Sequence, residues 1–259
     1  MSRTDELARQ AHRGFPERGG GARRIAARAA VARLLWDERG VRRVPPAATL
    51  DRALSALPRG ELEWICEFNP LGPLYFLPTP PFLRALARRI RSRGARRVLD
   101  VAAGDGHLAA ALSAHAPDLR IVASDSGKWE RPRARMNPRE RRELRGTPVA
   151  GIRPGPGVVR LDARAAIDRF RPDLVLACWV PPGPLLGRIL RAPVREVLEI
   201  GAGSGITGDI SCWRYEHEFC EDLEALGRCR LDERPSRKLH TRVTLYQPRP
   251  ERRARTPRS

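Results

Sequence analysis

The sequence predicts an α/β fold built on a mostly parallel sheet and preceded by helices. Short apolar runs alternate with segments of helical periodicity, and this alternation is typical of parallel strands joined by crossover helices. Several of the runs end in an acidic residue or lead into a glycine-containing turn, as strands do at the binding edge of such a sheet. The expected strands are 97–101, 120–125, 158–162 and 173–179, with a fifth that begins at Val197.

The chain is expected to divide into three regions. A basic arm and a helical extension precede the strand-rich domain, and a basic, proline-containing tail follows it. Apolar residues within 24–37 recur at helical spacing, and Thr49 can cap a second helix that ends near Ala56. Thr79 can cap a further helix that leads into the first strand. The expected boundaries are 1–59, 60–248 and 249–259.

The functional prediction depends on residues 98–108, which read VLDVAAGDGHL. They predict a strand, a tight turn that contains Gly104 and Gly106, and the first turn of a helix. Glycine permits positive φ and lets a ligand approach the backbone. The free N–H groups and the positive dipole end of the helix point at the turn. This arrangement suits a nucleotide-like ligand at the carboxyl end of a parallel strand.

Two acids narrow the class of ligand. Asp100 precedes Gly104 by four residues, and Asp125 closes the next strand, 19 residues after Gly106. An acid at the second position typically binds a ribose hydroxyl pair, and an acid at the first can hold a ligand ammonium group. S-adenosylmethionine (SAM) presents both groups, so SAM is the predicted cofactor.

This stretch resembles motif I of the class I SAM-dependent methyltransferases, in which an acid and three further residues precede Gly-x-Gly. Ala102 stands where the family carries an additional glycine. The resemblance implies a Rossmann-like fold, which has a seven-stranded mixed sheet, helices on both faces and a closing antiparallel strand pair. It also implies that Asp162, after the third strand, accepts a hydrogen bond from the adenine amino group of SAM.

The residues after the fourth strand occupy the place of the family's motif IV, where the acceptor meets the methyl group. Trp179 is expected to wall the acceptor pocket, and Pro181 is expected to fix its backbone. Amino-methylating enzymes carry a polar residue before these prolines, where this chain has Val180. The methyl acceptor therefore stays unidentified. His217 and His240 are available as bases, but the sequence does not place them.

A second glycine-rich run, 197–205, matches the motif I pattern more closely than the first. Only about 50 residues follow it, without a second strand–helix unit that ends in an acid. It is therefore interpreted as the fifth strand and its loop. The rest of the chain predicts a helix over 218–226 and a closing pair of strands over 227–232 and 240–246.

Two loop segments are expected to border the site. Residues 69–79 are rich in proline and aromatic residues and are expected to fold over bound cofactor, with a packed connecting loop as the alternative. Residues 128–157 are strongly cationic. A substrate-side lid, an RNA-contacting loop and a solvated insertion all remain open for them.

The formal net charge is +19, and only Lys128 and Lys238 among the 49 cationic residues are lysines. Abundant Arg with Ala, Gly and Pro fits a GC-rich coding sequence, whereas attraction to an anionic partner such as RNA is the other interpretation. No apolar run approaches the roughly 20 residues that span a bilayer, and the N-terminus lacks the apolar core of a secretory signal. A cytoplasmic protein without a membrane partner is expected.

The five cysteines are irregularly spaced, which favours a reducing compartment over a disulfide framework. Cys212, His217 and Cys220 follow a C-x4-H-x2-C spacing that lacks the paired knuckles of ordinary zinc sites, so no metal site is predicted.

The prediction is therefore a SAM-dependent methyltransferase. Two alternatives stay open. One is a catalytically inactive methyltransferase fold that acts as a basic RNA-binding or scaffold module. The other is a dinucleotide oxidoreductase, because residues 104–109 also fit the G-x-G-x-x-G/A fingerprint. The residues expected to bind SAM are Asp100, Gly104, Gly106, Asp125 and Asp162, and those expected to shape the acceptor pocket are Trp179 and Pro181.

Overall fold

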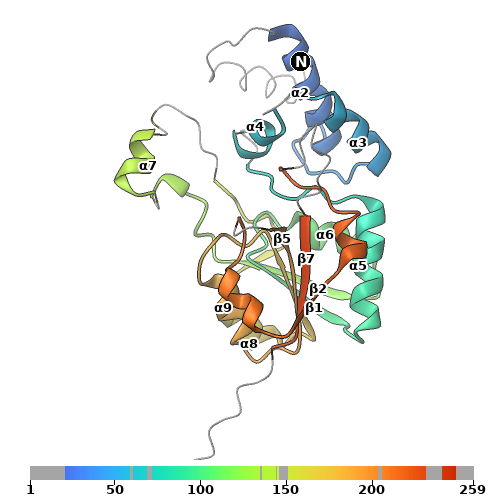
Figure 1. Ribbon diagram of the computed structural model, residues 1–259, viewed down its shortest axis with the longest axis vertical. Helices are drawn as coiled ribbons and strands as arrows, with labels where there is room; N and C mark the ends of the chain where they lie inside the picture. Colours follow the sequence, from blue (N-terminus) through green and yellow to red (C-terminus); the bar gives the residue numbers. More distant parts are fainter. Residues whose placement is uncertain are drawn as a thin grey trace, which may run out of the picture.

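A computed structural model describes residues 21–58, 61–68, 72–134, 136–143, 145, 151–203, 206–231 and 241–248. In this part of the chain, seven strands form one sheet in the order β3-β2-β1-β4-β5-β7-β6 (Figure 1). Strand β7 is antiparallel to both of its neighbours, and the other pairings are parallel. The strands are β1 (Arg97–Val101), β2 (Arg120–Asp125), β3 (Val158–Arg160), β4 (Leu174–Cys178), β5 (Val197–Ala202), β6 (His217–Phe219) and β7 (Thr241–Tyr246).

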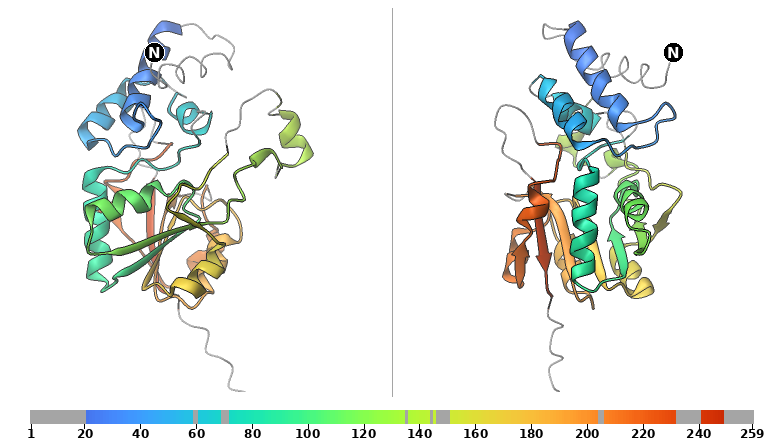
Figure 2. Two further views of the ribbon diagram at one scale, coloured as in Figure 1. Left: turned by 180° about the vertical axis from the view of Figure 1, so that it is seen from behind. Right: turned by 90° about the vertical axis from the view of Figure 1, so that its right-hand side faces the viewer.

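Helices cover both faces of this sheet, as the apolar runs of its central strands require. Side chains alternate between the faces, so that Leu174 and Leu176 pack in one core and Val175 in the other. Helices α5 and α6 lie on the first face, and α8 and α9 lie on the second (Figures 1 and 2). Their bounds are α5 (Pro80–Ser92), α6 (His107–His115), α8 (Ala163–Phe170) and α9 (Leu185–Leu190).

The N-terminal helices form a third, separate apolar cluster that stands beyond one edge of the sheet (Figure 1). Leu35, Leu50 and Leu62 are buried there, one from each helix. A buried ion pair between Arg28 and Glu61 joins the first helix to the third. The helices are α2 (Gly21–Leu35), α3 (Ala47–Ala56) and α4 (Glu61–Phe68), and α4 begins just after the division that the sequence places at residue 60.

Three smaller elements complete the described part. A 3-10 turn, η1 (Pro132–Ala134), and helix α7 (Pro138–Glu143) lie in the cationic segment after β2. Helix α7 stands away from the sheet in Figures 1 and 2. A second 3-10 turn, η2 (Ile210–Arg214), precedes β6, and helix α10 (Glu221–Glu224) packs near α5 and β7. No helix in these described ranges is both long and apolar enough to cross a membrane.

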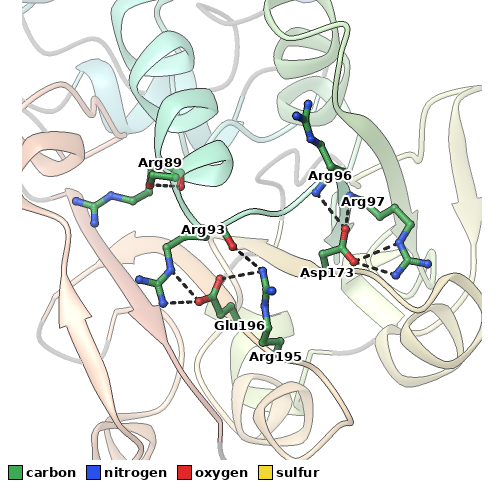
Figure 3. A network of polar contacts seen from close by, with 8 residues as sticks. Arg89, Arg93, Arg96, Arg97, Asp173, Arg195 and Glu196 are labelled. Atoms are coloured by element: carbon green, nitrogen blue, oxygen red, sulfur yellow. Dashed lines mark hydrogen bonds and ion pairs between the residues drawn. The ribbon is translucent and has the colours of Figure 1, made fainter.

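Ion pairs fasten the edge of the sheet at which β1, β4 and β5 begin (Figure 3). Asp173 accepts hydrogen bonds from the backbone N–H groups of Arg96 and Arg97 and from the Arg97 guanidinium. Glu196 pairs with Arg93 at 2.5 Å. These contacts join the starts of neighbouring strands, so most of the cationic groups at this edge already have carboxylate partners.

One predicted helix cap is wrong, and a second is right in position only. Helix α3 begins at Ala47 with Pro46 at its N-cap, so Thr49 lies inside the first helical turn and cannot cap it. Thr79 does stand at the N-cap of α5, but its side chain makes no capping hydrogen bond. Pro80 follows it and lacks an N–H group, so fewer donors at this helix start require a cap.

The predicted end of the chain also needs correction. Residues 217–219 form strand β6 in place of the start of a helix, and residues 227–231 form no strand of the sheet. The closing antiparallel pair is β6 with β7. Residues 227–231 instead bond to another segment, because Leu77 donates to Arg228 O and Arg230 donates to Tyr75 O. Asp232 and His240 lie outside the described residues.

Candidate cofactor and acceptor site

A large groove opens at the edge of the sheet where β1, β2 and β4 end, and its volume is about 1690 Å³. Pockets for one small ligand typically measure about 300–1,000 Å³, so this groove has room for a nucleoside cofactor and part of a second molecule. All seven residues that the sequence singles out line it: Asp100, Gly104, Gly106, Asp125, Asp162, Trp179 and Pro181.

The turn after β1 has the backbone that its glycines predict. Gly104 and Gly106 have φ of 58° and 77°, and Gly106 is the N-cap of α6. A Cβ at Gly106 would collide with the Val158 side chain, so this position needs glycine for space as well as for conformation. Ala102 also has a left-handed φ, 52°, although it is not glycine. The backbone therefore keeps, at Ala102, a conformation that favours glycine.

Asp100 lies at the floor of the groove with both carboxyl oxygens buried and without a hydrogen-bond partner in the described residues. Burial raises its pKa to about 8, with smaller contributions from the negative charges of Asp105 and Asp125. A buried carboxyl group without a partner is costly to a folded protein. The arrangement fits a ligand that brings a positively charged donor to this point.

Asp125 and Asp162 each use part of their acceptor capacity to shape the groove. Asp125 accepts from Gly104 N at 3.0 Å and from Gly127 N at 2.7 Å, so it fixes the glycine turn from the end of β2. Asp162 is exposed and caps α8 through Ala165 N at 3.0 Å. A carboxylate oxygen has two lone pairs. Both acids therefore retain acceptor sites for ligand hydroxyl or amino groups.

The N-terminal segment contributes a cation that sequence reasoning missed. Arg42 lies on the loop after α2, lines the groove and pairs with Asp105 at 3.0 Å. Its Nε is buried and has no partner in the described part of the chain, and desolvation lowers its pKa. Nothing in the local sequence distinguishes Arg42 from the many other arginines, because its role depends on the docking of the N-terminal helices.

His107, the first residue of α6, is held neutral beside this cation. Burial lowers its pKa to about 4, and the charge of Arg42 acts in the same direction. Its Nε2 is buried without a partner in the described residues. A neutral imidazole next to the turn can accept or donate one hydrogen bond, depending on its tautomer.

Aromatic side chains wall the other side of the groove. Trp179 stacks on Tyr75 with ring centroids 5.7 Å apart and an interplanar angle of 19°. The Arg230 guanidinium lies over both rings, 5.2 Å from the Tyr75 centroid and 5.7 Å from that of Trp179. We call Tyr75, Trp179 and Arg230 the acceptor wall. The sequence predicted Trp179 alone, because the other two reach it through the pairing of residues 75–77 with 228–230.

Trp179 is held in a conformation that bulky residues rarely adopt. Its φ is 52°, and its backbone N–H donates a hydrogen bond to Ile200 O at 2.7 Å. Such strained residues cluster at binding sites, where the surrounding structure holds them in place. Pro181, two residues later, also lines the groove. The backbone after β4 thus turns sharply at the point where an acceptor would enter.

The order and the direction of the strands match the sheet that the sequence predicts. Its first half runs outward from β1 through β2 to β3, its second half runs from β4 to β5, and the reversed β7 is inserted between β5 and β6. The sheet is the Rossmann-like, seven-stranded mixed sheet with a closing antiparallel strand pair that the sequence predicts. In this fold the groove lies where the order of the strands changes direction, between β1 and β4.

No protein-family model matches the sequence. No curated protein matches it either. Among solved structures, the chain is similar to the methyltransferase domain of bacterial CtHen1, with 12% identity over 64% of this chain and 96% of that chain and a TM-score of 0.38. The chain is also similar to TrmN from Thermus thermophilus, with 20% identity over 65% of this chain and 49% of that chain and a TM-score of 0.34. A third similar structure is an rRNA methylase from Escherichia coli, with 17% identity over 94% of this chain and 83% of that chain and a TM-score of 0.33.

The second glycine-rich run is the fifth strand of the sheet and the loop after it, as predicted. Its described part belongs to β5 and the residues after it, and 204–205 lie outside the described residues. Thr207 closes this region by accepting from Ala202 N at 2.9 Å, and a Cβ at Gly201 would collide with Thr207. The Thr207 side chain therefore occupies the space next to Gly201.

Both loop segments that the sequence places near the site contribute to the groove. The described part of 69–79 supplies Gly72–Phe76 and Pro78, and the cationic segment supplies 128–132 and 151–153. Whether residues 69–79 fold over a bound cofactor stays a prediction, and Asn69 lies outside the described residues.

Cys212 and Cys220 are buried as free thiols, and burial raises the pKa of each to about 11. Within the described ranges, no group of three or more His, Cys, Asp or Glu side chains is placed to hold a metal ion. His217 packs against Phe219 and Tyr246 in the β6–β7 region, and the groove lining does not include it.

Proposed function

We propose that this protein is a SAM-dependent methyltransferase. The observation that carries the proposal is Asp100, a buried carboxyl group without a partner in the described residues, set below a left-handed glycine turn. SAM carries an ammonium group that would give this carboxylate its missing donor. The methyl acceptor stays unidentified, and the domain boundaries and a cytoplasmic location without a membrane partner remain part of the proposal.

The residues of the groove divide into two sets with complementary chemistry. Asp100 would accept from the ammonium group of the methionine end, and Arg42 would donate to its carboxylate. Asp100 and Arg42 both line this groove. Asp125 would accept from the ribose hydroxyls and Asp162 from the adenine amino group. Gly104 and Gly106 would hold the turn beside this ligand in its left-handed conformation.

When SAM is bound, it supplies an electrophilic methyl group on a sulfonium centre. The protein's own contribution is to position the acceptor in line with that group and to exclude water from the point of transfer. Trp179 and Pro181 would orient the acceptor, because they line the same groove from the end of β4, next to the glycine turn at the end of β1. No described residue is placed as an evident general base, so this proposal assigns catalysis mainly to positioning.

Calorimetric titration of the full-length protein with SAM, S-adenosylhomocysteine and NAD(H) tests the proposal. We expect saturable binding of both SAM-type ligands and no binding of NAD(H). Asp100→Asn and Asp125→Ala should each weaken SAM binding by about ten-fold or more, since a hydrogen bond to a charged group contributes about 1.5–3 kcal/mol. Asp222→Asn is the matched control, because Asp222 is an exposed carboxylate that pairs with Arg89 away from the groove.

Two outcomes would contradict the proposal. Binding of NAD(H) without binding of SAM would favour an oxidoreductase, and binding of SAM without transfer of labelled methyl groups to any fraction of a cell extract would favour an inactive scaffold. A loss of SAM binding in Asp222→Asn as large as that in Asp100→Asn would show that the effect is not specific to the groove.

A further inference from the structure

The charges of this protein are distributed unevenly between the two edges of the sheet. At the edge where β1 and β4 begin, arginines have carboxylate partners: Arg91 with Asp118 at 2.5 Å, Arg93 with Glu196 at 2.5 Å and Arg97 with Asp173 at 2.8 Å. Figure 3 shows part of this network. Three carboxylates, Asp118, Asp173 and Glu196, thus pair with five arginines at this edge.

Around the groove the pattern is the opposite. Lys128, Arg131, Arg153 and Arg188 are exposed and line it, and none of them has an ion-pair partner in the described part of the chain. Two of the acids that line the groove are engaged in ion pairs, Asp105 with Arg42 and Glu130 with Arg160. In all, seven Lys or Arg and five Asp or Glu side chains line the groove. The groove therefore has an excess of positive charge in the described residues, whatever coding bias enriched the chain in arginine.

Aromatic rings accompany these cations. Trp129 lies between Lys128 and Arg131 at the rim, and 42% of it is exposed. Inside the groove, the stacked rings of Tyr75 and Trp179 form the acceptor wall. A cationic groove with exposed rings is the arrangement that binds single-stranded nucleic acid, since phosphates meet the cations and bases stack on the rings.

The position of the acceptor wall favours unpaired nucleotides. Trp179 follows β4 and is partly buried, whereas Trp129 and the cations that line the same groove are exposed. A base within a duplex cannot reach such an interior wall unless it leaves the stack. In the left view of Figure 2, α7 and the N-terminal helices stand on opposite sides above the sheet. The groove is lined by Arg42, which follows α2, and by residues 128–132 and 151–153, which flank α7 in the sequence.

We propose that the methyl acceptor is a single-stranded nucleic acid, with its phosphates on Lys128, Arg131 and Arg153 and an unpaired nucleotide against the acceptor wall. This inference rests on the proposed methyltransferase function. In the transfer, the bond between sulfur and the methyl carbon breaks with its electron pair going to sulfur. A new bond forms from that carbon to a nucleophilic atom of the nucleotide, which releases its proton to solvent.

Fluorescence anisotropy tests the inference with a labelled single strand of about 20 nucleotides, long enough to exceed one binding site. RNA, DNA of the same sequence, the corresponding duplex and polyglutamate are compared. Wild-type protein is compared with Arg131→Gln/Arg153→Gln. The matched control is Arg88→Gln/Arg120→Gln, because both of these arginines are exposed and neither lines the groove.

We expect the Arg131→Gln/Arg153→Gln protein to bind the single strand about ten-fold more weakly near 100 mM salt. Its plot of log affinity against log salt should be shallower by about 1.4, since each phosphate contact on a single strand contributes about 0.7. The control should stay within about two-fold of wild type. Trp129→Ala should weaken binding of the single strand by about ten-fold through lost stacking.

Three results would overturn the inference: equal losses in the control variant, tighter binding of polyglutamate than of nucleic acid, or tighter binding of the duplex than of the single strand. Titration of the same proteins with SAM separates this failure from that of the proposed function. A protein that binds SAM and no nucleic acid contradicts only the acceptor class. One that binds nucleic acid and no SAM contradicts the methyltransferase function.

Discussion

Asp100 combines burial with a carboxyl group that accepts no hydrogen bond in the described part of the chain. Burial raises its pKa from an ordinary 3.8 to about 8, so the folded protein without ligand holds this proton at neutral pH. The same property prepares the group for a cationic ligand, because an ammonium donor would favour the ionised form. The burial of Asp100 thus both destabilises the ligand-free protein and favours the binding of a cationic ligand.

This cost makes the stability of the free protein depend on pH. Between about pH 4 and pH 8 the unfolded chain releases the Asp100 proton while the folded chain keeps it, so the free energy of unfolding falls as pH rises. Asp100→Asn removes this contribution. Thermal unfolding should find the variant more stable than wild type at pH 8, with a difference that shrinks toward pH 4.

Glu199, whose pKa burial raises to about 7, adds a slope of the same sign to both proteins. The comparison of wild type with Asp100→Asn is therefore the informative one. Identical pH slopes in the two proteins would show that Asp100 is already ionised in the folded state.

Ala102 and Trp179 show how far individual residues can be predicted. The substitution of a family glycine by Ala102 is expected to be mild, and the backbone does keep a left-handed φ of 52° there. The strain of an L-residue in this region, about 1–2 kcal/mol, is carried by the turn. The same φ at Trp179 could not be predicted, because aromatic residues give no sequence signal for it.

At the scale of elements, Asp173 fastens the starts of β1 and β4. It accepts from Arg96 N at 3.0 Å, from Arg97 N at 2.8 Å and from the Arg97 guanidinium (Figure 3). These donors, led by the Arg97 side chain, lower its pKa to about 2. Asn in its place offers one neutral acceptor oxygen, so the two strand starts would lose most of their shared anchor.

We expect Asp173→Asn to lower the free energy of unfolding by about 1–3 kcal/mol at pH 7, as measured by urea titration. The folded pKa lies below the ordinary value, so the stabilisation is present above about pH 3.8 and is lost as pH falls toward 2. Asp168→Asn, which removes an exposed pair with Arg164 on α8, should change stability by less than about 0.5 kcal/mol. Equal effects would contradict the anchoring role.

The strands that the sequence predicts best are those with continuous apolar runs. Strands β1 and β2 have the expected bounds, and β4 and β5 differ from expectation only at their ends. Strand β6 was missed because its three residues, His217–Phe219, are partly or fully exposed and have no apolar alternation. Its pairing with β7 decides its structure, and no local pattern encodes that pairing.

The candidate site could be predicted in part, for a related reason. The glycine turn and the three acids that follow strands have local patterns, because a parallel sheet places every strand end at the same edge. Arg42, Tyr75 and Arg230 come from segments without such a pattern. They reach the groove through tertiary contacts, and those contacts become visible only in three dimensions.

At the scale of the whole molecule, the N-terminal cluster and the groove share residues. Trp36 is buried in the cluster and also lines the groove, and Arg42 follows on the same loop. Loosening the cluster should therefore weaken cofactor binding from a distance. Leu50→Ala removes a fully buried side chain of α3 that does not line the groove.

For Leu50→Ala we expect the cluster to lose about 2–4 kcal/mol of stability, with faster amide hydrogen exchange in α2–α4. SAM affinity should fall in proportion to the fraction of molecules in which the cluster is docked. Leu86→Ala, an equal truncation under α5, should destabilise the sheet core and leave SAM affinity unchanged in the folded protein. Unchanged SAM affinity in Leu50→Ala would show that the cluster is independent of the site.

The acceptor wall has a consequence for the order in which this protein acquires its properties. Tyr75, Trp179 and Arg230 are far apart in the sequence. Contacts between such residues form late, because closing the long loops between them costs conformational entropy. During synthesis, the glycine turn and its strands emerge well before Arg230. Arg230 is also the last residue of the groove lining to be synthesised, so the acceptor wall is the last part of the groove for which a nascent chain has all the residues.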